Sequence, residues 1–184
     1  MNATSVRNET ALVAGGSRGL GLLVARELAE RGYRVHVCAR DADELARGAA
    51  LLAREGLHIT TAVCDVTDAN AVARWVESAA DDDAPISVAI AVAGVIQVGS
   101  IEAATPEMFD EAVDIMTKGP AYLALAVLPG MRARRRGRIG IVSSIGGALG
   151  VPHLVPYCTA KFGAAGLGQS LHAELGGTGV TVTT

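Results

Sequence analysis

The sequence predicts an α/β fold in which a parallel β-sheet is covered by helices on both faces. Short, nearly continuous apolar runs alternate with longer segments of helical periodicity along the whole chain, as expected for strands that are buried on both faces. A glycine-rich turn also joins the first apolar run to the first helical segment. The 184 residues, half of them hydrophobic, suit one domain with a sizeable core.

Six strands are expected, each as a short apolar run bounded by polar or turn residues. The sequence contains no internal repeat, linker or low-complexity segment, which favours a single domain over residues 1–184. The last run stops at Thr184 with no turn after it, so either the sequence is a C-terminally incomplete fragment or the natural chain stops unusually early. The expected strands are Thr10–Ala14, Arg34–Cys38, His58–Val63, Ile86–Ala91, Arg138–Val142 and Val180–Thr184.

The first helix is expected directly after the glycine-rich turn. Leu20, Val24 and Leu28 recur at helical spacing with charged residues on the other side, and Gly32 follows as the expected C-terminal stop.

Two further helices are expected around the third strand. Asp41 with Glu44 three residues later is typical of a capping box, which predicts a helix to about Glu55. Another helix, centred on Trp75, is expected after the third strand.

Two long helices complete the pattern. Thr105 is expected to cap a helix that runs to about Ala133, and Pro106 suits the first helical position because its missing N–H is not needed there. The last helix is expected at roughly Val155–Glu174.

Charge and composition argue against partners other than small molecules. A net charge of −3 gives no general attraction to nucleic acid or to anionic membranes. The arginines between Arg132 and Arg138 are expected to complement the negative end of the preceding helix and to stay solvated. The apolar region Ile86–Ile101 is too interrupted to span a membrane.

The cysteines predict neither a disulfide framework nor a structural metal. Cys38, Cys64 and Cys158 form no CxxC pair and no His/Cys cluster, which favours a reducing compartment. The polar start Met1–Thr10 lacks the apolar core of a signal peptide. We therefore expect a cytoplasmic protein without a bound metal.

The glycine-rich turn is a candidate pyrophosphate site. Glycines at a strand-to-helix junction let a phosphate approach the helix N-terminus, whose free N–H groups favour anions. A tight turn without a ligand is the competing interpretation, and methyltransferases use similar loops. The spacing G-x-x-x-G-x-G is nevertheless more specific than a lone glycine pair. The expected ligand-binding residues are Gly15, Ser17, Arg18, Gly19, Leu20 and Gly21.

The end of the second strand predicts the choice of cofactor. A carboxylate there would accept a hydrogen bond from the ribose 2′-hydroxyl of NAD, but this chain has Ala39 followed by Arg40. Arg40 and Arg18 therefore favour a 2′-phosphate, and hence NADP(H). NAD(H) remains an alternative, because Asp41 could reach the hydroxyl instead.

Tyr157 and Lys161 are candidate proton-transfer residues. A spacing of four places the phenol and the ammonium on one helix face, and a nearby cation favours the phenolate. The Y-x-x-x-K spacing is common on protein surfaces. Ser144 strengthens the interpretation, because it follows the fifth strand, where open α/β sheets place their ligands.

Together these residues resemble the short-chain dehydrogenases/reductases of the shorter type, over essentially the whole chain. The motifs occur in the family's order and on the expected elements. They are the glycine-rich turn, Asp65-Val66 after the third strand, Ala93-Gly94 after the fourth, Ser143-Ser144 after the fifth, and Tyr157 to Lys161.

The resemblance implies a fold and a set of roles. The fold is a Rossmann-type doubly wound parallel sheet of order 3-2-1-4-5-6, here without the family's seventh strand and substrate lid. The resemblance assigns Ser144 to polarise a substrate carbonyl, Tyr157 to transfer the proton and Lys161 to bind the nicotinamide ribose. The further cofactor-binding residues that it implies are Asp65, Val66, Ala93, Gly94, Tyr157 and Lys161.

Three departures from the family pattern bear on activity. Ala91-Val92 stands where the family usually has Asn-Asn, and Met116 stands at its usual helix asparagine. The segments that normally follow the sixth strand, including the substrate lid, are missing after Thr184. We expect Pro120, which has no N–H, to leave the Met116 carbonyl free to hold a water.

Two functions follow as hypotheses. The first is an NADP(H)-dependent oxidoreductase that interconverts a ketone and a secondary alcohol, active as a homodimer through the helices at Thr105–Ala133 and Val155–Glu174, as in the family. The second is a dinucleotide-binding sensor or scaffold with little or no turnover. Neither involves nucleic acid, a membrane or a metal.

Overall fold

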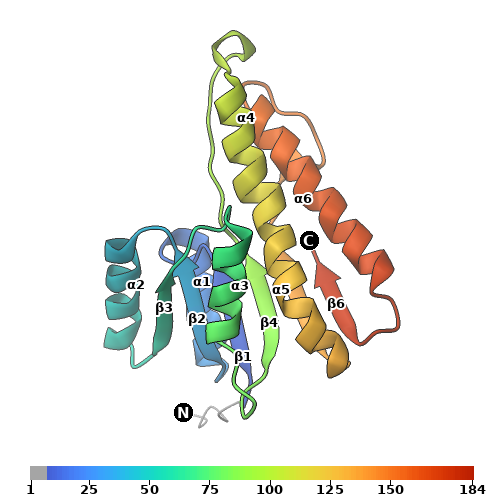
Figure 1. Cartoon of the computed structure of the whole chain (residues 1–184). Helices are drawn as coiled ribbons and strands as arrows, with labels where there is room; N and C mark the ends of the chain where they lie inside the picture. The colour runs from blue at the N-terminus through green and yellow to red at the C-terminus, as the bar shows by residue number, and fades with distance from the viewer. Residues whose placement is uncertain (1–7) are drawn as a thin grey trace.

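A computed structural model describes residues 8–184 and shows a six-stranded parallel sheet of order β3-β2-β1-β4-β5-β6 (Figure 1). The predicted fold class and strand order are confirmed. The strands are β1 (Thr10–Ala14), β2 (Arg34–Ala39), β3 (Ile59–Val63), β4 (Ile86–Ala91), β5 (Gly137–Ile141) and β6 (Val180–Thr183). The helices are α1 (Gly19–Glu30), α2 (Ala42–Arg54), α3 (Ala69–Ser78), α4 (Pro106–Val113), α5 (Gly119–Ala133) and α6 (Val155–Glu174). Within residues 8–184, none of the helices combines the length and apolar character needed to cross a bilayer.

Alternate residues of β1 belong to two different cores, as expected when successive side chains point to opposite faces of a sheet. Val13 packs with residues of α1 and α2, including Leu28 and Leu45. Leu12 packs in the larger core, to which α3, α4, α5 and α6 contribute and which contains Trp75 and Leu123. Figure 1 shows α3 and α5 lying in front of the sheet. Cys38, Cys64 and Cys158 are free, buried thiols.

The helix expected as one piece over Thr105–Ala133 is interrupted by a π-helical turn at Asp114–Lys118. At this turn the Gly119 N–H donates to the Asp114 carbonyl five residues back. Pro120 has no N–H to give to the Met116 carbonyl, so the regular bonding pattern cannot pass through this point. Pro120 therefore explains why the helix widens into a π-helical turn here.

Two details of the predicted helix starts are wrong. The Thr105 hydroxyl makes no capping bond to the start of α4, although Pro106 does occupy the first turn. Instead, a hydrogen bond from Thr105 to the Glu107 carboxylate lowers the pKa of Glu107. In α1 the buried residues are Gly21, Ala25 and Leu28, whereas Leu20 is exposed. Leu20 points away from the core because it lines the cavity described below.

The cap of α2 is half of the predicted capping box. The Asp41 carboxylate accepts from the Glu44 N–H at 2.8 Å, as expected. The Glu44 side chain does not return the bond. Its carboxylate contacts the glycine-rich turn instead.

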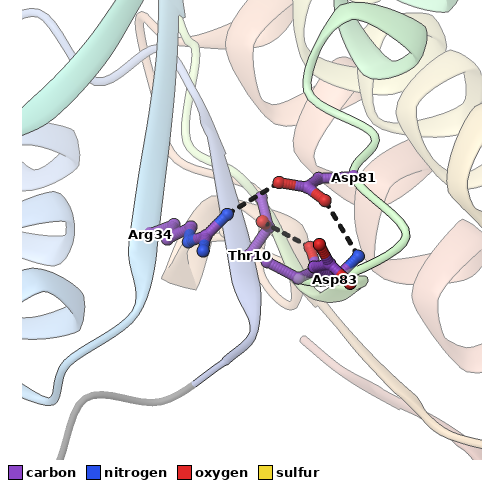
Figure 2. A network of polar contacts seen from close by, with 5 residues as sticks. Thr10, Arg34, Asp81 and Asp83 are labelled. Atoms are coloured by element: carbon purple, nitrogen blue, oxygen red, sulfur yellow. Dashed lines mark hydrogen bonds and ion pairs between the residues drawn. The ribbon is translucent and has the colours of Figure 1, made fainter.

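Polar contacts fasten the edge of the sheet that lies opposite the glycine-rich turn (Figure 2). The Thr10 hydroxyl donates to the Ala84 carbonyl at 2.7 Å, and Arg34 forms an ion pair with Asp81 at 2.7 Å. The Asp81 carboxylate also accepts from the Asp83 N–H at 2.8 Å. The loop at residues 81–84 therefore joins the first residues of β1 and β2 to the segment that leads into β4.

Candidate active site and cofactor pocket

A cavity of about 580 Å³ lies at the carboxyl edge of the sheet, beside the turn that follows β1. Predicted cofactor residues in its wall are Gly15, Ser17, Arg18, Leu20, Gly21, Arg40, Val66, Ala93 and Gly94. Four other residues predicted to bind the cofactor do not line it, namely Gly19, Asp65, Tyr157 and Lys161. Residues that sequence reasoning did not assign to the cofactor are Cys64, Val92, Ile115 and Glu44.

Glycine is required at two positions of the turn. Gly15 has a φ of +88°, and a Cβ there would collide with the backbone of Ala93. A Cβ on Gly21 would collide with the Gly15 carbonyl. The turn can therefore lie flush against the segment after β4, with the N-terminus of α1 beside the cavity, where its N–H groups favour an anion. The residues present fit a dinucleotide, because the cavity lies beside the first residues of α1, where a pyrophosphate can accept hydrogen bonds from free N–H groups.

Charged side chains of both signs surround the end of the cavity nearest β2. Arg18 and Arg40 are present as predicted, and Ala39 carries no carboxylate. Glu44 Oε2 accepts from the Ser17 hydroxyl at 3.0 Å and lies 3.4 Å from Arg18 Nε. The sequence signal for Glu44 was its capping-box spacing, which indicated a local bond and not a contact with the turn.

Asp65 shapes the turn after β3. Its Oδ1 accepts from both the N–H and the hydroxyl of Thr67, each at 2.9 Å. The turn presents Val66 to the cavity wall and to Gly119, where a Cβ would lie 3.2 Å from Val66 Cγ2. Contact between Asp65 and the cofactor stays a prediction.

Tyr157 and Lys161 face one another on the first turns of α6. The Lys161 Nζ lies 5.8 Å from the centre of the Tyr157 ring. Lys161 is only 5% exposed, and its Nζ donates to the Val142 carbonyl at 2.7 Å. Burial lowers the pKa of Lys161 below its usual value. A lysine with one backbone partner therefore sits beside a half-buried phenol.

The segment after β5 is fastened to α6 at these residues. The Ser143 hydroxyl donates to the Lys161 carbonyl at 3.2 Å. Ser144 caps a short 3₁₀ turn, accepting from the Gly146 N–H at 3.2 Å. A Cβ on Gly146 would lie 3.1 Å from the Tyr157 ring. Ser144, Tyr157 and Lys161 thus belong to two segments that pack against each other.

Met116 forms an apolar contact at the place where the family usually has an asparagine. It is 1% exposed, and a Cβ on Gly94 would lie 3.4 Å from its sulfur. It shares a core with Ala91. The next residue, Thr117, donates through its hydroxyl to the Ala160 carbonyl at 2.9 Å. The π-helical turn is therefore held against both the cavity wall and the helix that carries Lys161.

His153 lies on an exposed loop before α6. It has a φ of +64°, and its carbonyl accepts from the Gly99 N–H at 3.0 Å. This bond joins the loop after β4 to the loop before α6. Large apolar side chains are exposed in these two loops, namely Ile96, Val98, Ile145 and Leu149.

Comparison with known proteins supplies the family. The family described as short chain dehydrogenase matches residues 9–184. This chain belongs to the short-chain dehydrogenase/reductase family. The match covers every motif on which the resemblance was based.

Two relatives illustrate how far the similarity extends. A protein of Streptomyces violaceoruber described as a ketoacyl reductase of the granaticin polyketide synthase is 38% identical over 178 residues, which cover 94% of this chain and 64% of that protein. Dehydrogenase/reductase SDR family member 4 of Homo sapiens is 36% identical over 169 residues, covering 91% of this chain and 61% of the human protein. The chain therefore spans just under two thirds of the length of these relatives.

Two solved structures share the fold. A variant of actinorhodin polyketide ketoreductase with NADPH superposes with a TM-score of 0.90 at 33% identity, over 99% of this chain and 70% of that one. A metagenomic short-chain oxidoreductase in complex with NADP gives 0.88 at 30% identity, over 96% of this chain and 80% of that one.

The buried Lys161 predicts a pH signature in stability. Because its folded-state pKa lies below 10.5, the unfolded chain binds more protons between that lowered pKa and 10.5, and wild-type stability rises with pH in this window. Replacing Lys161 by Met removes this effect. The difference in unfolding free energy, variant minus wild type, should therefore fall as pH rises through the window, as measured by urea denaturation.

Lys118 is the matched control. It is exposed, and its hydrogen bond to Asp114 raises its pKa above 10.5, so its contribution is constant below that pH. For Lys118→Met the difference should be flat up to pH 10.5. A flat difference for Lys161→Met would show that its ammonium is not desolvated.

Proposed function

We propose that this chain is an NADP(H)-dependent oxidoreductase that interconverts a ketone and a secondary alcohol. The observation that carries the proposal is the Tyr157–Lys161 pair, packed against the segment that carries Ser144 at the carboxyl edge of the sheet. The family supports an oxidoreductase, and the two structural neighbours that hold NADPH and NADP support the cofactor.

The chain's residues divide the work between binding and proton transfer. The glycine-rich turn would hold the pyrophosphate, and Arg18 and Arg40 would hold the 2′-phosphate. NADPH, when bound, supplies the hydride.

The proton is handled by the chain itself. Tyr157 donates it to the carbonyl oxygen during reduction and accepts it during oxidation. The Ser144 hydroxyl donates a hydrogen bond to the same oxygen and thereby stabilises the developing negative charge. The Lys161 ammonium, 5.8 Å from the centre of the Tyr157 ring, would bind the nicotinamide ribose.

The surroundings favour an apolar ketone as the substrate. Ile96, Val98, Ile145 and Leu149 are exposed in the loops next to the site. A relative described as a ketoacyl reductase supports a ketone on an acyl chain. We also infer that the protein works in the cytoplasm.

A cofactor-binding module with little turnover is the second candidate. It is favoured by the absence of amide side chains at Ala91, Val92 and Met116, which leaves an apolar contact where the family has polar side chains. NADPH binding without consumption of NADPH, across a panel of ketones, would support it.

We predict that Tyr157→Phe abolishes ketone reduction while NADPH still binds. The variant keeps the ring and loses only the proton donor, so turnover should fall at least about a hundredfold, in the range of general acid catalysis. NADPH oxidation measures turnover, and cofactor fluorescence measures binding. Tyr122→Phe, on α5, is the control and should leave both unchanged. Full turnover in Tyr157→Phe would refute the role of Tyr157.

We predict that NADPH binds at least about tenfold more tightly than NADH. A charge-assisted hydrogen bond to phosphate contributes about 1.5–3 kcal/mol, and Arg18 and Arg40 both line the cavity. Arg40→Asp should shift the preference towards NADH, as measured by titration calorimetry. Equal dissociation constants for the two cofactors in the wild-type chain would contradict the assignment.

We predict that Met116 supports a working site. The buried Met116 side chain packs against Gly94, where an asparagine would instead form hydrogen bonds between the helix and β4. Pro120 has no N–H to bond the Met116 carbonyl, so this carbonyl can hold a water that passes protons between Lys161 and solvent. Met116→Asn, alone or with Ala91→Asn, should therefore change turnover only modestly. A gain of a hundredfold or more from Met116→Asn alone, about 2.7 kcal/mol of barrier, would show that the native relay is impaired.

We predict a homodimer through the helices of the Thr105–Ala133 and Val155–Glu174 regions. Leu125 on α5 is 67% exposed and Phe162 on α6 is 47% exposed, and burial of such side chains favours association. Leu125→Glu should weaken the dimer in sedimentation at micromolar concentration. Leu23→Glu, on the equally exposed face of α1, should not. A monomeric wild-type chain would contradict the prediction.

A further inference from the structure

We propose that Glu44 restrains the preference for a 2′-phosphate by holding a fixed negative charge beside Arg18. The inference rests on the proposed function, because it assumes that the adenosine end of the cofactor lies at this wall of the cavity. It adds a specificity-determining residue that belongs to neither the glycine-rich turn nor the end of β2.

The contact between Glu44 and the turn is direct. Glu44 Oε2 accepts from the Ser17 hydroxyl at 3.0 Å and pairs with Arg18 Nε at 3.4 Å. Ser17 is buried, with 8% of its surface exposed, and all three residues line the cavity. The same carboxylate oxygen therefore engages a buried donor and the cation that would meet the phosphate.

Glu44 is anchored, whereas Arg18 is free to move. The Glu44 N–H is bonded to the Asp41 carboxylate at 2.8 Å, and its side chain is 26% exposed. One turn later, Gly48 brings α2 so close to the turn that a Cβ would lie 2.7 Å from the Ser17 carbonyl. The Arg18 side chain is 81% exposed. When a phosphate binds, Arg18 can turn towards it, but the Glu44 carboxylate stays in place.

The charges at this wall cancel. Arg18 and Arg40 are balanced by Asp41 and Glu44, and these four are the charged side chains of the cavity wall. A 2′-phosphate near Arg18 is repelled by the Glu44 carboxylate, whereas a 2′-hydroxyl can donate to it. Glu44 therefore selectively weakens the binding of the phosphorylated cofactor. The difference in affinity between NADP(H) and NAD(H) becomes smaller as a result.

The alternative is that Glu44 only clamps α2 to the turn. Glu44→Gln separates the two interpretations, because its amide oxygen can still accept from Ser17 while the charge is lost. Adenosine 2′,5′-bisphosphate and adenosine 5′-phosphate are suitable probes, since they differ only in the 2′-phosphate and need no catalysis. Their dissociation constants can be measured by titration calorimetry at low ionic strength.

Glu44→Gln should bind adenosine 2′,5′-bisphosphate about fivefold more tightly than the wild type, which corresponds to about 1 kcal/mol. Adenosine 5′-phosphate should change by less than about twofold, and the gain should shrink at high salt. Glu55→Gln is the matched control. It removes the same charge at the end of α2, from an ion pair with Arg26 outside the cavity, and should alter neither constant.

An unchanged ratio of the two constants in Glu44→Gln, or equal weakening of both probes, would identify a clamp and overturn the proposal. Failure of wild-type and variant alike to bind the bisphosphate would overturn it too. A wild-type chain that prefers adenosine 5′-phosphate would refute the NADP(H) assignment, yet a selective gain in Glu44→Gln would still support the role of Glu44. Absence of ketone turnover bears on the enzyme assignment alone.

Discussion

The close approach of two backbone segments, after β1 and after β4, is the constraint on which the site depends. The Ala14 carbonyl accepts from the N–H groups of both Val92 and Ala93, at 2.8 and 3.0 Å, and Gly15 lies against Ala93 with no room for a Cβ. These strands are neighbours at the point where the chain order of the sheet reverses, which is where open α/β sheets form their crevice. The glycine-rich turn, the floor of the cavity and the start of α1 all take their positions from this contact.

A second group of contacts holds the catalytic candidates. Burying the Lys161 ammonium is unfavourable in itself, and the Val142 carbonyl is its hydrogen-bond acceptor within residues 8–184. Ser143 meanwhile bonds the Lys161 carbonyl, so the segment after β5 touches the same residue at both its side chain and its backbone. These contacts fix the positions of Ser144 and Tyr157 relative to each other. They do so although burial of the Lys161 ammonium costs free energy. This pattern is typical of a functional site, where local stability is given up for position.

Much of this arrangement follows from local sequence, and the exceptions have physical causes. The strands and the turn at Gly15–Gly21 were predictable because apolar runs and glycines act over a few residues. The split of the long helix was not predicted, although its cause, Pro120, had been identified. Leu20 was placed both on the helical stripe of α1 and among the ligand-binding residues, and it lies in the cavity wall, because periodicity alone cannot tell a core from a cavity wall. The contact of Glu44 with Ser17 spans 27 positions and depends on how α2 docks at Gly48, which no local pattern encodes.

The burial of Lys161 has a practical consequence for labelling the protein. The chain contains only two lysines, and the other, Lys118, lies on the exposed side of the π-helical turn with its ammonium paired to Asp114. Amine-reactive dyes and surface linkers therefore have one lysine side chain within easy reach. Attachment at Lys118 would place a reporter on the helix turn whose next residues press on Val66 of the cavity wall. A fluorophore there could sense occupancy of the pocket without occupying it.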